Sequence, residues 1–267
     1  MRKILSKLII LIMGLALLTG CFTTPPSPEP DGVVYRAFFV GISKYENGMT
    51  LPSPAKNTDK LEDLFTQCKF GENETQFQII EKLINLDATK ENILNGIDDA
   101  FYEADDNDVS YFYYMGHGGV KGGTPVITAT DSTGCICKNI TVHELEARLS
   151  MISGTKVVLL ETCHAGNFID KGKKIVLDPF DKFSLDLLNK EGYQVLASSA
   201  GDEYTWDFPN GSPFCNALIN GCKNLTADSN EDEIVDISEL YHYIKLHVIK
   251  QTVQIYPENS IFPITEF

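Results

Sequence analysis

Two residues of this sequence, Cys163 and His117, have side chains suited to nucleophilic chemistry, and each directly follows a run that predicts a strand. Cys163 comes after the apolar run 157–160, whose β-branched first residues favour a buried strand. His117 follows the aromatic run 109–115 and lies among three glycines. If the two strands are neighbours, their ends bring an imidazole beside a thiol. The imidazole can then accept the thiol proton and leave a thiolate nucleophile.

Alternating strands and helices are predicted around these two segments. Apolar runs predict further strands at 33–42, 76–84 and 194–199, and a short hairpin is expected at 124–131. Apolar spacing predicts helices at 56–65, from Thr89 with a stripe reaching Phe101, from Thr141 with Glu144 as capping-box partner, at 214–221 and at 240–248. This alternation predicts an α/β fold with a mostly parallel central sheet flanked by helices on both faces.

The N-terminus predicts a targeting segment rather than part of the fold. A basic start, an apolar run over 8–18 and the sequence Leu-Thr-Gly-Cys at 18–21 resemble a bacterial lipoprotein signal, in which the cysteine is lipidated. We therefore expect a signal peptide at 1–20, a Pro-rich tether at 21–32 and one folded domain at 33–267. The resemblance implies an extracytoplasmic protein, anchored to a bacterial membrane through Cys21.

Composition excludes one class of partner and leaves the cysteines open. The net charge is −15, and such an acidic surface repels nucleic acid. Six cysteines follow Cys21, too few for a fold of this size built on disulfides. Cys135 and Cys137 are read as a redox pair, as half of a metal site or as loop cysteines without a role.

The order of the two strand-end motifs resembles the caspase-like cysteine peptidases, most closely the bacterial caspase and metacaspase branch. In that family a strand ending in Gly-His-Gly precedes one ending in Asp-x-Cys-His-x-Gly. Here the two read Met-Gly-His-Gly at 115–118 and Glu-Thr-Cys-His-Ala-Gly at 161–166. The resemblance covers nearly everything from about residue 33 onward and implies the caspase-like fold.

The resemblance also implies roles for these residues in peptide-bond cleavage. Cys163 would be the nucleophile, and His117 would handle the protons of the thiol and of the leaving amine. The backbone N–H groups of Gly118 and Cys163 would form the oxyanion hole. His164 would be structural. No cofactor is required for such a His/Cys pair.

Specificity is where the sequence departs from the family pattern. Metacaspases hold a basic side chain with acidic groups, one of them two residues before the nucleophile, which is Glu161 here. Met115 replaces a serine, and Asp202 is a further candidate for the substrate pocket. A family aspartate at the start of the first helix falls on Asn57, Thr58 or Asp59. We expect a peptide or protein substrate cleaved after Arg or Lys.

Two further segments carry expectations of their own. Residues 228–239 place oxygen ligands at the spacing of an EF-hand loop, with Glu233 where glycine is usual, and are read as a calcium site or as an acidic helix-entry loop. The candidate ligands are Asp228, Asn230, Asp232, Asp236 and Glu239. The lysines at 171, 173 and 174 lie where some family members cut themselves, although a solvated loop is the plainer interpretation.

Two other interpretations of the whole chain stay open. The first is a catalytically inactive binding module with the same fold, displayed on the membrane. The second is a metal- or redox-active protein that uses Cys135, Cys137 and Cys163.

Overall fold

The computed structural model describes residues 32–132, 136–171 and 187–267, and its main compact unit runs from Val33 to Phe267. The predicted signal peptide, Cys21, nearly all of the tether, Cys135, Lys173 and Lys174 lie outside the described residues. In the described part of the chain, no helix has the length and apolar character needed to cross a membrane.

A six-stranded sheet forms the centre of this unit, in the order β10-β8-β7-β3-β1-β2. Five of its strands are parallel, as the alternating pattern predicts, and the edge strand β10 runs antiparallel to β8. The strands are β1 (Tyr35–Gly41), β2 (Phe77–Ile84), β3 (Val109–Met115), β7 (Thr155–Glu161), β8 (Tyr193–Ala197) and β10 (Gln254–Tyr256).

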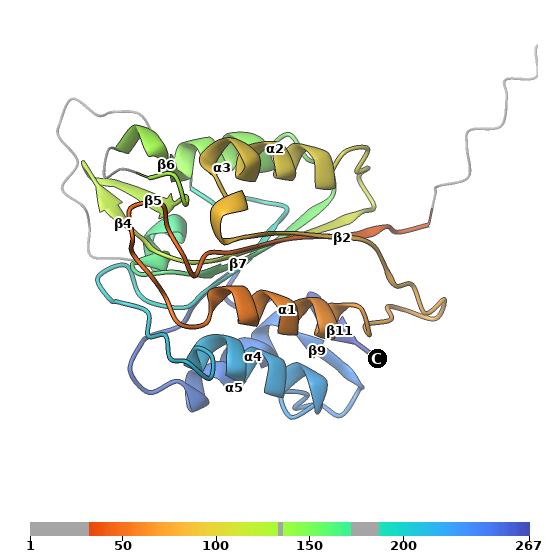
Figure 1. Cartoon of the computed structure of the whole chain (residues 1–267). Helices are drawn as coiled ribbons and strands as arrows, with labels where there is room; N and C mark the ends of the chain where they lie inside the picture. The colour runs from red at the N-terminus through yellow and green to blue at the C-terminus, as the bar shows by residue number, and fades with distance from the viewer. Residues whose placement is uncertain (1–31, 133–135, 172–186) are drawn as a thin grey trace, which may run out of the picture. The chain divides into compact units, whose positions relative to one another are not determined.

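Helices cover both faces of this sheet (Figure 1). One face is covered by α2 (Lys90–Ala100) and α3 (Val142–Leu149), and the other by α1 (Pro54–Phe65), α4 (Pro213–Lys223) and α5 (Ile237–His247). Alternate residues of each strand point to opposite faces. Phe112 of β3 therefore packs with the α2 and α3 side, and Tyr111 with the α1, α4 and α5 side. The predicted fold class is confirmed.

Two of the predicted helix starts are confirmed at the level of the cap. The Thr89 side chain accepts from the Asn92 N–H, and Thr141 forms a capping box with Glu144. Each cap satisfies backbone donors that the first helical turn leaves without partners. These local interactions explain why helix starts were readable from sequence.

The hairpin expected at 124–131 is displaced in the structure. A small antiparallel sheet is formed instead by β4 (Gly118–Lys121), β5 (Thr124–Thr128) and β6 (Asn139–Thr141). Its tight turn lies at Gly122 and Gly123, which both have positive φ. A two-residue Gly-Gly turn has the backbone twist that a hairpin requires, so this pair was the signal that the sequence interpretation missed.

The last helix also begins earlier than the predicted residue 240. Asp236 caps α5 and forms a capping box with Glu239, so the helix starts at Ile237. The remaining short elements are the strands β9 (Ile234–Asp236) and β11 (Pro263–Glu266), which pair with each other, and the 3₁₀ turns Asn85–Asp87, Ile136–Lys138 and Ala165–Ile169.

Candidate active site

The candidate site lies at the carboxyl ends of the neighbouring strands β3 and β7. Their register places Met115 opposite Glu161, and the pairing continues for one more step, with the Gly116 N–H donating to the Glu161 carbonyl at 3.2 Å. His117 and Cys163 each come two residues after that last register pair. The register therefore brings the two residues to the same edge of the sheet, where parallel sheets hold their sites.

Gly118 packs directly against the residue that precedes the candidate nucleophile. A Cβ atom at position 118 would lie 2.2 Å from Thr162 Oγ1 and 2.8 Å from the Val126 carbonyl oxygen. Only glycine fits that approach. The segment that carries His117 is thus in contact with the segment that carries Cys163, and a side chain at 118 would force the two apart.

The electrostatic surroundings of His117 favour a neutral imidazole at rest. Its side chain is partly buried, and this burial lowers its pKa, while the Asp207 carboxylate opposes that effect and raises it. The ring packs at 5.0 Å from the Tyr45 ring, measured between centroids. A neutral imidazole has one nitrogen free to accept a proton.

Burial also favours the neutral form of the Cys163 thiol. Burial raises its pKa, and N–H groups of Thr205 and of Cys163 itself lower it in part. Among the four free cysteines of the described residues, Cys163 is the one that is not fully buried. A raised thiol pKa beside a lowered imidazole pKa means that the resting pair is uncharged near pH 7.

His164 follows the thiol in a left-handed backbone conformation, with φ of 62°. Its Nδ1 lies 3.0 Å from the Gly201 carbonyl oxygen, and its ring packs edge-on at 5.1 Å from Tyr204. Its backbone N–H donates to the Glu203 carbonyl at 2.8 Å. These contacts tie His164 to the loop after β8 and direct its ring toward that loop.

Glu161 lies beneath the site and is almost wholly enclosed, with 1% of its surface exposed. The Tyr113 hydroxyl donates to its Oε2 at 2.5 Å. Burial raises its pKa to about 7, although the nearby Ser212 hydroxyl lowers it in part. Within the described residues, its Oε1 atom has no hydrogen-bond partner of good geometry. The carboxyl is thus a buried acceptor with spare capacity.

The other residues expected to line the substrate pocket fall in different places. Met115 is buried next to Glu161, and its Sδ accepts from Asn57 Nδ2 at 3.3 Å. Asn57 is fully buried, and its Oδ1 lacks a partner among the described residues. Thr58 instead bonds the Pro54 carbonyl and Asp59 pairs with Lys82, so Asn57 is the residue that faces Met115. Asp202 lies exposed in the turn after β8.

Sequence reasoning missed Asp207, the acidic residue with the most direct influence on the site. It is partly exposed. Its carboxylate accepts from the Ser53 N–H at 3.1 Å and from the Ser53 hydroxyl. Its negative charge acts on both His117 and Glu161. The only sequence signal was its place in the same loop as Asp202, because its partner Ser53 is 154 positions away.

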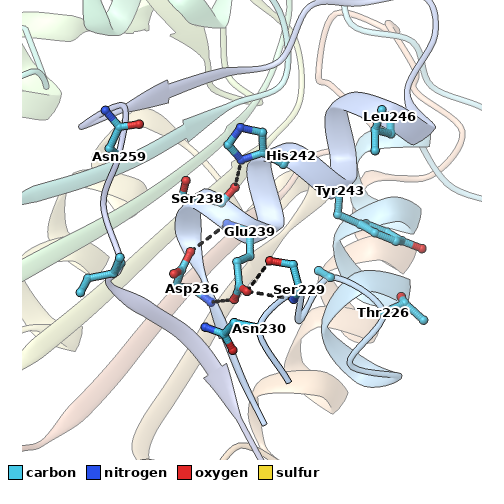
Figure 2. A pocket seen from close by; sticks show the side chains of 12 residues that line it. Thr226, Ser229, Asn230, Asp236, Ser238, Glu239, His242, Tyr243, Leu246 and Asn259 are labelled. Atoms are coloured by element: carbon cyan, nitrogen blue, oxygen red, sulfur yellow. Dashed lines mark hydrogen bonds between the residues drawn. The ribbon is translucent and has the colours of Figure 1, made fainter. Parts of the chain in front are cut away.

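The five residues expected to bind calcium lie in another part of the unit, around α5 and β9. Asp228 and Asn230 accept from loop N–H groups, and Glu239 accepts from Ser229 and Asp236. Figure 2 shows Asp236 and Glu239 at the wall of a pocket. This pocket has a volume of about 520 Å³, and neither His117 nor Cys163 lines it. Within the described ranges, no three acidic, His or Cys side chains converge as metal ligands would. Calcium binding stays a prediction.

Two other expected segments are partly described. Cys137 is disulfide-bonded, so it is not a free thiolate ligand for a metal. Cys163, in contrast, is free. Lys171, one of the three lysines of the possible self-cleavage segment, forms an ion pair with Glu258.

These observations define the class of protein: the chain is an α/β protein with a histidine and a cysteine at the ends of adjoining parallel strands. The chain belongs to the caspase domain family, whose description matches residues 35–260 and whose members are cysteine peptidases. The resemblance inferred from the two motifs is confirmed at the level of the family. No curated protein matches the sequence significantly.

Two solved structures show how widely this fold is shared. Protein GSU0716 from Geobacter sulfurreducens has 14% sequence identity and a TM-score of 0.63, over 84% of this chain and 92% of its own. Caspase-1 from Spodoptera frugiperda has 14% identity and a TM-score of 0.57, over 86% and 87%. At these identities the two likenesses bear on the fold alone.

The raised pKa of Glu161 predicts a pH dependence of stability. Its pKa rises from an ordinary 4.5 to about 7 on folding. Below pH 4.5 the Glu161 carboxyl is protonated in both the folded and the unfolded protein. Between these two values only the folded state keeps the proton, so stability falls as the pH rises through this window, by about 3 kcal/mol at most.

Glu161→Gln should remove this fall, because glutamine resembles the protonated carboxyl. We expect the variant to gain stability relative to the wild type between pH 5 and pH 8. Urea denaturation at the two pH values measures the difference. An equal difference at both values would show that Glu161 does not titrate in this range.

Proposed function

We propose that this protein is a cysteine endopeptidase in which Cys163 attacks a peptide carbonyl and His117 moves the protons. One observation carries the proposal: the β3–β7 register brings the two residues to adjacent strand ends. The contact of Gly118 with Thr162 supports it by joining the two segments. The caspase domain supplies the wider class, a cysteine peptidase that acts on peptides or proteins.

The uncharged resting pair suits a stepwise proton transfer. His117 takes the thiol proton as Cys163 Sγ bonds to the carbonyl carbon, and the carbonyl oxygen becomes an oxyanion. The N–H groups of Gly118 and Cys163 are the proposed donors to that oxyanion. His117 then gives the proton to the amine nitrogen as the oxyanion collapses and the C–N bond breaks, which leaves a thioester on Cys163. Water, deprotonated by His117, attacks this thioester, and the C–S bond breaks to release the acid and restore the thiol.

A basic residue before the scissile bond is the preferred substrate. Asp207 offers a partly exposed carboxylate whose charge acts on His117 and Glu161, and Glu161 and Asn57 each have a buried oxygen without a hydrogen-bond partner of good geometry among the described residues. A guanidinium or ammonium group has several donors and no acceptor. Such a group complements one carboxylate with two further acceptors near it. Met115 would contribute the apolar wall.

The setting that we propose is extracytoplasmic. The signal-like segment 1–20 and the cysteine at 21 indicate a lipid anchor on a bacterial membrane, and the prolines that follow would hold the peptidase away from the surface. Metabolic labelling with a fatty-acid analogue, in full-length protein and in Cys21→Ser, tests that anchor.

The function is tested with short fluorogenic peptides that end in Arg, Lys or Asp, added to residues 22–267 with and without calcium. We expect cleavage after Arg and Lys and none after Asp. Equal rates with calcium and with a chelator would show that cleavage does not require calcium. A folded sample that cleaves no peptide under either condition would favour the alternative, an inactive binding module on the same fold.

A further inference from the structure

Two tyrosines hold the backbone of His117 from both sides. The Tyr45 hydroxyl accepts from the His117 N–H at 2.7 Å. The Tyr114 hydroxyl lies 2.7 Å from the His117 carbonyl oxygen and 2.8 Å from that of Thr128, and it can donate to either. Side-chain hydroxyls therefore contact both backbone polar groups of His117, and the Thr128 N–H of β5 also donates to the His117 carbonyl at 2.9 Å.

The two hydroxyls also meet each other beneath the histidine. Tyr45 and Tyr114 hydrogen-bond to each other, and both are buried. A Cβ atom at Gly116 would lie 2.7 Å from the Tyr45 hydroxyl and 2.6 Å from the Tyr114 hydroxyl. The glycine before His117 is therefore required so that both phenols can reach this point. We call the pair of phenols the tyrosine clamp.

The tyrosine clamp acts on the imidazole as well as on the peptide. The Tyr45 ring packs against the His117 ring at 5.0 Å with an angle of 41° between the planes. Both phenols are close enough to Cys163 for a thiolate to raise their pKa values, although burial is the larger cause in each case. The clamp thus contacts His117 directly and lies within electrostatic reach of Cys163.

Tyr45 is itself held in place by the loop between β1 and α1. Its N–H donates to the Met49 carbonyl at 3.1 Å, and its own carbonyl accepts from Gly48 at 3.0 Å. The next residue, Glu46, donates to the Thr130 carbonyl at 3.1 Å. These hydrogen bonds hold the loop in place, so the Tyr45 phenol has a defined position against His117.

We infer that Tyr45 and Tyr114 are positioning residues, which set the pose of the His117 imidazole beside Cys163 without touching the substrate. This inference rests on the proposed function for its kinetic consequence, but not for its structural one. A proton carrier that is misplaced by about 1 Å can cost about 100-fold in rate. Fixing the peptide and the ring together prevents such a displacement.

The kinetic test compares Tyr45→Phe and Tyr114→Phe with Tyr111→Phe. Tyr111 is the matched control, because it is a buried tyrosine of the same strand as Tyr114 whose hydroxyl bonds the carbonyls of Pro263 and Ile264. We expect kcat to fall about 10- to 100-fold in the two clamp variants, with KM within about twofold. Tyr111→Phe should lose similar stability and keep its kcat. Equal kcat values in all three variants would overturn the inference.

A second readout needs no turnover, so it separates this inference from the proposed function. The chain has five histidines, and His117→Asn identifies the ring signal of His117 in a proton–carbon NMR spectrum. We expect that signal to broaden or shift in Tyr45→Phe and Tyr114→Phe, and to stay unchanged in Tyr111→Phe. An unchanged signal in both clamp variants would refute the clamp. An inactive wild type with a perturbed signal would refute only the peptidase.

Discussion

Replacement of Cys163 by alanine is expected to lower kcat for peptide hydrolysis by about 10⁴- to 10⁶-fold, because it removes the sulfur atom that we propose forms the acyl intermediate. The fold should be kept, since Cys163 lies at a strand end and is not fully buried. Peptide binding should also persist, because the proposed pocket is built from other residues. Kinetics, circular dichroism and binding of a peptide to the variant measure the three properties.

Cys222→Ala is the matched control for this variant. Cys222 lies fully buried on α4, and burial raises its pKa to about 12, so it remains an unreactive thiol. Its loss should cost some stability and leave kcat as it was. If Cys163→Ala kept a tenth or more of the wild-type rate, another nucleophile would be at work and the proposed chemistry would fail.

The second large effect is expected at Asp207. Asp207→Asn should lower kcat/KM for a peptide ending in Arg by about 10- to 100-fold, and Asp207→Lys by more, since a lysine would repel the substrate. The effect should follow charge. With a citrulline peptide, which has arginine's shape but no charge, the wild type and Asp207→Asn should be nearly equal. Measuring kcat/KM with the two peptides separates charge recognition from a general loss of structure.

Two further variants identify which acid is responsible. Ser53→Ala removes a hydroxyl that donates to Asp207 and leaves the carboxylate charge in place, so its effect on the arginine peptide should be small. Asp202→Asn tests the further pocket candidate that the sequence offered in the same loop. If Asp202→Asn caused the larger loss, the assignment of Asp207 to the pocket would be withdrawn.

Most of the fold could be predicted because its signals are local. The apolar runs before His117 and Cys163 mark strands that are confirmed as β3 and β7. Thr89 and Thr141 mark helix starts whose caps need only residues three positions away. The hairpin was misplaced because the Gly122 and Gly123 pair was overlooked, although that signal is also local.

The sequence by itself determined the two candidate reactive residues and the strand ends that hold them, because strand periodicity and a glycine-flanked histidine are visible along the chain. Only the tertiary structure decided what surrounds them. Asp207 is held by Ser53, which lies 154 positions away in the sequence. The Tyr45 hydroxyl accepts from the His117 N–H, which lies 72 positions away. These side chains come from loops, which have no periodicity, and burial rather than local propensity sets the pKa values of the site. Contacts of that kind exist only once the chain has folded.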